Sequence, residues 1–139
     1  MINYMRPRAA AVTLDKGKLL LIHRIKGSMN YWVLPGGSIE EGEPPEQACC
    51  REVREEVGLE IDILKPLTKL VNHDREETYF LARHRSGSIA LGGPELSRSS
   101  ESNRYEPQWV SFERLSELNL HPVSIRAILA EQIDAGNSD

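Results

Sequence analysis

Residues 37–59 read GSIEEGEPPEQACCREVREEVGL and carry the most informative pattern in this chain. Pro44 and Pro45 suit the first turn of a helix, because a missing backbone N–H costs nothing there. Gly58 suits a helix C-terminus, where a left-handed residue is common. The segment therefore predicts a helix from about Pro45 to Val57.

The predicted helix has two distinct faces. Cys49, Val53 and Val57 recur at i, i+4 and i+8, which predicts an apolar stripe packed on a sheet. About 100° around the helix lies a stripe of carboxylates: Glu52, Glu55 and Glu56. Like charges three or four residues apart on a helix repel each other. Because hard divalent cations prefer such oxygen ligands, the stripe indicates a site for an ion such as Mg²⁺.

The segments before this helix predict strands and turns. Residues 9–14 and 18–23 are apolar runs on either side of Asp15-Lys16-Gly17, the pattern of a hairpin. Residues 31–34 form a third apolar run, and Pro35-Gly36-Gly37 ends it with a predicted turn.

The segments after the helix are less regular. They predict strands at 61–64, 67–72 and 78–83, then a long loop over 85–106 with one short strand at 88–91. A last strand at 108–112 precedes a helical turn at 113–118. An amphipathic helix is expected over 123–133, opened by Pro122.

Bulk properties restrict the class of protein. A chain of 139 residues suits one compact domain, so we expect residues 1–139 to form a single unit. A net charge of −4 does not favour broad binding to nucleic acid or membrane surfaces. No apolar run approaches the roughly 18 residues of a membrane span, and Met1–Arg8 lacks the apolar centre of a signal peptide. We therefore expect a cytoplasmic protein with neither a membrane nor a nucleic acid as its partner.

The segment at 37–59 resembles the sequence box of the Nudix hydrolases, the family that includes the MutT-like enzymes. The box is Gly, five residues, Glu, seven residues, then Arg-Glu-apolar-x-Glu-Glu-x-Gly-apolar. This chain has the required residue at every fixed position: Gly37, Glu43, Arg51, Glu52, Val53, Glu55, Glu56, Gly58 and Leu59. The resemblance implies the family's α/β/α sandwich with a mixed central β-sheet.

The resemblance also implies a chemistry. Members of the family cleave the diphosphate linkage of a nucleoside diphosphate joined to another group, with Mg²⁺ or, as an alternative, Mn²⁺. It implies that Glu52 and Glu56 are direct metal ligands, with the Gly36 carbonyl also facing the metal. Glu55 is expected to bind a second ion or to orient the water, and Arg51 to position a glutamate.

Further site residues are expected outside the box. In some family members a glutamate in a later loop acts as the catalytic base, which makes Glu106 the first candidate and Glu101 the second. The box itself is the alternative source of the base. Arginines that flank predicted strands are candidate phosphate contacts: Arg8, Arg24 and Arg83. Tyr105 is a candidate for stacking on a base.

The expected partner is therefore a small nucleotide substrate, and a homodimer stays open because dimers are frequent in the family. Two alternative interpretations remain. The acidic helix can be a solvated surface, which the full box disfavours, or the chain can be a regulatory module that binds nucleotides without hydrolysis. The identity of the substrate is not readable from the sequence.

Overall fold

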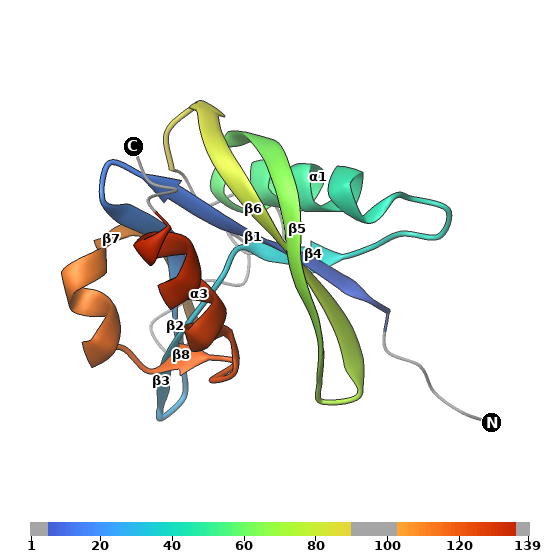
Figure 1. The fold of residues 1–139 in the computed structure, drawn as a ribbon. Helices are drawn as coiled ribbons and strands as arrows, with labels where there is room; N and C mark the ends of the chain where they lie inside the picture. The colour runs from blue at the N-terminus through green and yellow to red at the C-terminus, as the bar shows by residue number, and fades with distance from the viewer. Residues whose placement is uncertain (1–5, 90–102, 136–139) are drawn as a thin grey trace.

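A mixed sheet, with eight strands in the described residues, forms the centre of the molecule. Figure 1 shows helices on both sides of it. The computed structural model describes residues 6–89 and 103–135. The strands are β1 (Arg8–Asp15), β2 (Lys18–Lys26), β3 (Met29–Val33), β4 (Gly36–Ser38), β5 (Glu60–Asn72), β6 (Arg75–Ser86), β7 (Asn103–Ser111) and β8 (Leu120–His121). The helices are α1 (Pro45–Val57), the 3-10 helix η1 (Phe112–Glu117) and α3 (Ile125–Asp134).

Strand β1 lies at the centre of this sheet. It pairs in parallel with β6 and antiparallel with β4 and β2, and β3 pairs in parallel with β8. Pairing between β1 and β2 is limited to two registered pairs beside their turn, Leu14 with Leu19 and Asp15 with Lys18. Farther along, β2 pairs with β3 and β7 instead, so the sheet curls and holds both parallel and antiparallel pairs.

Alternate residues of β1 belong to two separate cores. Ala9 and Ala11 pack with the apolar face of α1 on one side of the sheet. Ala10 and Val12 pack on the other side, in the cluster that contains Ile125 and Leu129 of α3. Successive side chains of a strand point to opposite faces, so one short run supplies both layers. This arrangement confirms the predicted α/β/α sandwich.

Helix α1 has the predicted bounds. Gly58 ends it in the left-handed conformation, with φ 80°, and its N–H bonds to the Arg54 carbonyl. Cys49, Val53 and Val57 are completely buried, as the spacing predicts. Burying such a stripe is what ties a short helix to a domain, because its own propensity is insufficient.

The predicted turn at Pro35-Gly36-Gly37 is wrong, because Gly36 and Gly37 lie in strand β4. Gly36 pairs with Ala10 and Gly37 with Ala9 of β1. Neither glycine has a positive φ. A Cβ built on Gly36 would lie 2.2 Å from the Ala9 carbonyl oxygen. Gly36 is therefore required for close approach of two strands, and not for a turn.

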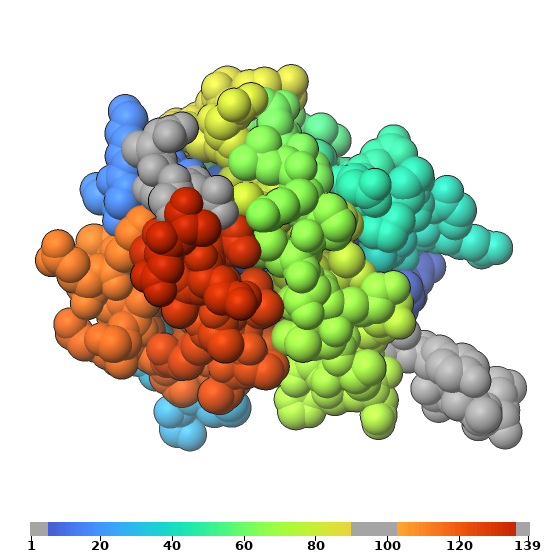
Figure 2. Space-filling model, viewed as in Figure 1, coloured from blue at the N-terminus to red at the C-terminus, as the bar shows by residue number. Residues whose placement is uncertain are grey.

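The two strands predicted at 61–64 and 67–72 are one long strand, β5. Lys65 and Pro66 separated them in the sequence, but β5 lies at the edge of the sheet, where proline is tolerated. Register shifts near Ile63–Lys65 and Pro66–Thr68 absorb the irregularity. β5 also lies against α3 on the face shown in Figure 2. Leu67 and Leu70 are partly buried against the core cluster that contains Ile125 and Leu129 of α3.

The C-terminal third differs most from the prediction. β7 begins at Asn103 and not at residue 108, so Glu106 is in a strand and not in a loop. Ser88 and Ile89 are outside any strand, and the remainder of the strand predicted at 88–91 lies outside the described residues. Helix α3 begins at Ile125, and Val123, expected in its apolar face, is exposed. No helix in the described part of the chain is long and apolar enough to cross a membrane.

Candidate active site

One pocket of about 390 Å³ collects the acidic stripe of α1 and a set of basic side chains. Its acidic wall consists of Glu52, Glu55 and Glu56, and Gly36, Gly37 and Ser38 of β4 lie beside them. Its basic side chains are Arg8, Arg24 and Arg75, and Tyr105 completes the lining. We call this the glutamate pocket. Its charges are nearly balanced, as a site for a cation and an anion together requires.

Strand β4 fits closely against the glutamates. The Gly36 N–H donates to Oε1 of Glu56 at 3.0 Å, and Glu56 is only 9% exposed. A Cβ on Gly37 would lie 2.2 Å from Oε2 of Glu52. The carboxylate of Glu52 therefore occupies the space that any other residue at position 37 would fill with its side chain.

Arg51 connects the acidic stripe to the preceding loop. Its Nη1 donates to Glu52 at 2.9 Å and to Glu55 at 3.1 Å. Its Nε and Nη2 hold both carboxylate oxygens of Glu43, at 2.8 and 2.9 Å, and Nη2 also donates to the Ser38 carbonyl. The hydrogen bond to Glu43 raises the pKa of Arg51 further above its ordinary value. Arg51 therefore contacts two of the three carboxylates of the stripe, and its positioning role stays a prediction.

Glu43 braces the loop in front of α1. Besides Arg51, the backbone N–H of Glu40 donates to its carboxylate at 3.0 Å. The Arg51 hydrogen bond first, and then the Glu40 N–H, lower the pKa of Glu43 from about 4.5 to about 2. Hydrogen bonds to the charged form of a carboxyl favour that form. Glu43 is therefore ionised at neutral pH and engaged in structure.

The basic side of the pocket has unused hydrogen-bonding capacity. The Nε atoms of Arg8 and Arg24 are buried and have no hydrogen-bond partner among the described residues. Arg24 also lies over the ring of Tyr105, with its guanidinium carbon 3.7 Å from the ring centroid. A buried donor without an acceptor is costly, so an anion bound here would satisfy these groups.

Arg75 is a pocket residue that the sequence did not reveal. Burial, and then the nearby charge of Arg8, lower its pKa, and its guanidinium contacts Ser38. Phosphate contacts were expected at arginines that flank strands, and the strand that follows residues 67–72 was predicted to begin at Thr78. The strand begins at Arg75, so a correct boundary would have identified this residue.

Two predicted candidates lie elsewhere in the described structure. Glu106 is cross-strand from His23, and its carboxylate is 3.4 Å from His23 Nδ1. Because neighbouring residues of a strand point to opposite faces, Glu106 points away from the side to which Tyr105 points. Arg83 is exposed and pairs with Asp62 at 3.6 Å. Neither lines the glutamate pocket, and Glu101 lies outside the described residues.

The donor set of the pocket suits a hard divalent cation. Three carboxylates and the Gly36 carbonyl are oxygen ligands of the kind that Mg²⁺ prefers. Within residues 6–89 and 103–135, no three His, Cys, Asp or Glu side chains are already arranged around an ion position. Arg51 donates hydrogen bonds to Glu52 and Glu55, so a cation would compete with Arg51 for these carboxylates.

Comparison with known proteins identifies the family. The model of the NUDIX domain matches residues 4–131 of the 139 residues. The chain therefore belongs to the NUDIX domain family, whose members typically use a divalent metal ion.

Curated relatives match parts of the chain. It is 41% identical over 56 residues to an 8-oxo-dGTP diphosphatase of Proteus vulgaris, covering 38% of this chain and 50% of that protein. It is 31% identical over 102 residues to the dihydroneopterin triphosphate diphosphatase of Escherichia coli K12, covering 71% and 64%. An RNA pyrophosphohydrolase of a Sulfurovum species is 37% identical over 79 residues, covering 52% and 50%. The chain thus spans about half the length of the first curated relatives that it matches.

Solved structures share the fold. A NUDIX-family hydrolase from Clostridium perfringens superposes with a TM-score of 0.71 at 21% identity, covering 96% of this chain and 97% of that one. A MutT NUDIX hydrolase from Burkholderia pseudomallei gives 0.66 at 24% identity, covering 90% and 95%. These similarities establish the fold over nearly the whole length of both chains.

Proposed function

We propose that the protein is a Mg²⁺-dependent hydrolase that cleaves the diphosphate linkage of a nucleoside diphosphate joined to another group. The observation that carries this proposal is the glutamate pocket, where three box carboxylates face three arginines around one space. Carboxylates suit the cation, and guanidinium groups suit phosphate oxygens. A pocket for the metal alone would not need the arginines.

Each residue has a distinct part in the proposal. Glu52 and Glu56, with the Gly36 carbonyl, would hold the ion. Once bound, Mg²⁺ neutralises phosphate charge and lowers the pKa of a coordinated water. Arg8, Arg24 and Arg75 would hold the diphosphate oxygens, which matches the unsatisfied Nε atoms of the first two.

Glu55 is our candidate for the group that accepts a proton from the attacking water. Its side chain is 50% exposed, whereas that of Glu52 is 19% exposed. It is therefore the carboxylate in the pocket with the freest access to water. Glu106 is less favoured, because its carboxylate faces His23 on the other side of β7.

The relatives support a reaction at a phosphate anhydride without naming one substrate. Their names give 8-oxo-dGTP, RNA and dihydroneopterin triphosphate, and each is a diphosphatase or a pyrophosphohydrolase. For this chain we propose the shared reaction, on a nucleotide or a similarly phosphorylated small molecule.

One observation favours a second candidate, a module that binds nucleotides without hydrolysis. The box carboxylates are engaged by Arg51 and by the Gly36 N–H. If the Arg51 contacts persisted in the presence of Mg²⁺, the other arginines would still bind phosphate but Glu52 and Glu55 would not be released to the metal.

A single assay separates the two candidates. Phosphate and nucleoside monophosphate release would be measured from a panel of nucleotide diphosphates and triphosphates with Mg²⁺. The variants are Glu56→Gln, in the pocket, and Glu46→Gln, an exposed glutamate in the first turn of the same helix. Loss of a metal-site carboxylate should reduce turnover at least about 100-fold.

The Glu56→Gln variant keeps an oxygen that can accept from the Gly36 N–H, so the fold should be retained. Glu46→Gln should match wild type. Saturable nucleotide binding without Mg²⁺-dependent turnover on any panel member would reject the hydrolase and leave the binding module.

A further inference from the structure

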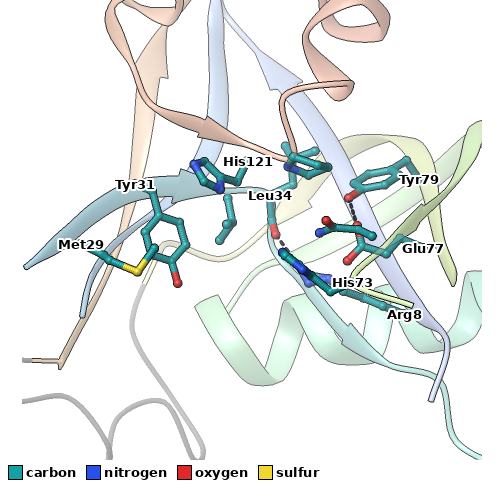
Figure 3. A pocket seen from close by; sticks show the side chains of 11 residues that line it. Arg8, Met29, Tyr31, Leu34, His73, Glu77, Tyr79 and His121 are labelled. Carbon is teal, nitrogen blue, oxygen red and sulfur yellow. Dashed lines mark hydrogen bonds between the residues drawn. The ribbon is translucent and has the colours of Figure 1, made fainter. Parts of the chain in front are cut away.

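A second cavity, of about 280 Å³, shares Arg8 with the glutamate pocket, and Figure 3 shows its lining. We call it the Glu77 cavity. Tyr31 and Met29 of β3 form one side, and Arg8, His73 and Glu77 lie opposite, with Leu34 between. A volume at the low end of the range for small-molecule sites suits one ring system better than a second nucleotide.

A buried carboxylate is the distinctive group in this cavity. Glu77 is 6% exposed, one of few buried charged residues in the described part of the chain. The Tyr79 hydroxyl, two residues along β6 and on the same face, donates to Glu77 Oε1 at 2.5 Å. Burial first, and then this hydrogen bond, raise the pKa of Tyr79. Tyr79 therefore stays a donor, and Glu77 is held as an acceptor.

Glu77 retains capacity to accept further hydrogen bonds. An ionised carboxylate has about four lone-pair positions, and the Tyr79 hydroxyl uses one of them. A buried carboxylate beside an open cavity favours a ligand that supplies hydrogen-bond donors. A ligand that turned its own acceptors toward Glu77 would lose water from both groups and gain no hydrogen bond in return.

Arg8 is shared by the two spaces. It lines both the glutamate pocket and the Glu77 cavity, and it is the registered neighbour of Glu77 on the parallel strands β1 and β6. Its Nη2 is fixed by the Leu34 carbonyl at 2.7 Å. A molecule with its phosphates at the arginines would have to pass Arg8 to place its ring in the cavity.

We propose that the Glu77 cavity binds the ring of the substrate, and that Glu77, oriented by Tyr79, selects rings with two adjacent N–H donors on one edge. This is the 2-amino-4-oxopyrimidine edge that guanine and pterin rings share. The proposal rests on the proposed function, since it assigns the group attached to the diphosphate.

The chemistry of ring edges explains the selection. Guanine presents a ring N–H and an amino group side by side, which match the two oxygens of a carboxylate. Hypoxanthine keeps the ring N–H and lacks the amino group. Adenine presents a bare ring nitrogen beside its amino group, so its lone pair would face the carboxylate. A site with buried hydrogen-bonding groups rejects a ligand that leaves them unpaired.

The first test measures binding and needs no turnover. Calorimetric titration of the wild-type protein with GMP, IMP and AMP in the presence of Mg²⁺ should give that order of affinity. We expect GMP to bind about 10- to 100-fold more tightly than AMP, with IMP between. Neopterin and guanosine, titrated separately, show whether the pterin or the guanine source of the edge is preferred. Equal affinities for GMP and AMP would overturn the proposal.

The second test removes the selecting group. Glu77→Gln keeps the size of the side chain and an oxygen for Tyr79, but it places an amino group against the ligand donors. Its preference for GMP over AMP should fall to within about twofold, and kcat on a GTP substrate should change less than KM. Glu76→Gln, an exposed neighbour paired with Lys69, should retain the wild-type preference.

Glu77→Asp provides a second variant if Glu77→Gln does not fold. It keeps the negative charge, but the shorter side chain places the carboxylate farther from the cavity, so the preference for GMP over AMP should again weaken. An unchanged preference in either folded variant would overturn the assignment of Glu77. Failure of the proposed hydrolase would appear differently, as absence of Mg²⁺-dependent turnover on every substrate while the binding preference persists.

Discussion

The glutamate pocket and the Glu77 cavity share Arg8 but are built in different ways. Most of the glutamate pocket comes from one continuous stretch, residues 36–56, in which β4 and α1 are held together by Arg51. The Glu77 cavity draws residues from five strands, among them Arg8 of β1, Tyr31 of β3, Asn72 of β5, Glu77 of β6 and His121 of β8. The first is a local construction and the second depends on the whole sheet.

The two sites should therefore determine different properties of the protein, one the reaction and the other the preference for a ring. Arg51 is within hydrogen-bond distance of Glu43, Glu52 and Glu55, so the geometry of the first pocket is specified by residues close in sequence. The described lining of the Glu77 cavity has one acidic residue, Glu77, which accepts a hydrogen bond from the Tyr79 hydroxyl. We expect reaction chemistry to follow the first and ring preference to follow the second.

The largest effect should come from Gly37→Ala, which damages the glutamate pocket alone. The new Cβ would meet the Glu52 carboxylate at 2.2–2.3 Å, so Glu52 must move. Because small misplacements of catalytic groups are costly, kcat should fall about 100-fold. Steady-state turnover with GTP and ATP measures this, and the ratio between the two substrates should stay at its wild-type value.

Gly17→Ala is the matched control for that variant. Gly17 has φ 77° in the β1–β2 turn, and a Cβ built on it would meet no atom within 4 Å. Alanine there should cost roughly 1–2 kcal/mol of unfolding free energy but leave turnover per folded molecule unchanged. A loss of ring preference in Gly37→Ala would break the separation between the two pockets.

Arg8→Gln should affect both sites, with a smaller loss of activity. Removing the guanidinium deletes a proposed phosphate contact from the glutamate pocket and part of the lining of the Glu77 cavity. We expect kcat/KM to fall about tenfold, together with a changed ratio between GTP and ATP. Arg85→Gln, at an exposed arginine that pairs with Glu60 and Asp62, should stay within about twofold of wild type. An altered kcat/KM with an unchanged ratio would show that Arg8 serves the phosphates alone.

The smallest effect concerns stability in acid. The folded-state pKa of Glu43, about 2, lies below its ordinary value near 4.5. Its pairing with Arg51 therefore stabilises the fold above pH 4.5, and this contribution is lost as the pH falls from about 4.5 to about 2. Urea unfolding across this window should show a steeper loss of stability in wild type than in Glu43→Gln. Parallel curves for the two proteins would contradict the assignment.

The sequence was informative where the pattern was local. The bounds of α1, its buried face of Cys49, Val53 and Val57, and the β1–β2 hairpin were all predicted. Each depends on contacts between residues only a few positions apart, for which helix periodicity and turn chemistry are sufficient.

The errors occurred where distant pairing determined the structure. Pro66 looked like a break, although an edge position in the sheet accommodates it. Gly36 and Gly37 looked like a turn, although the approach of β1 and α1 explains why they lack side chains. Arg75, Glu77 and the start of β7 depend on the same long-range register, so the Glu77 cavity had no signature in the sequence.

The alternation of side chains along β1 has a consequence for how the protein unfolds. Two cores in one chain could in principle melt separately. Here Ala9 and Ala11 belong to one and Ala10 and Val12 to the other, so detaching β1 from either layer exposes both. The two cores should therefore melt as one cooperative unit. Backbone amides of β1 should exchange with solvent only through global opening, whichever face their side chains occupy.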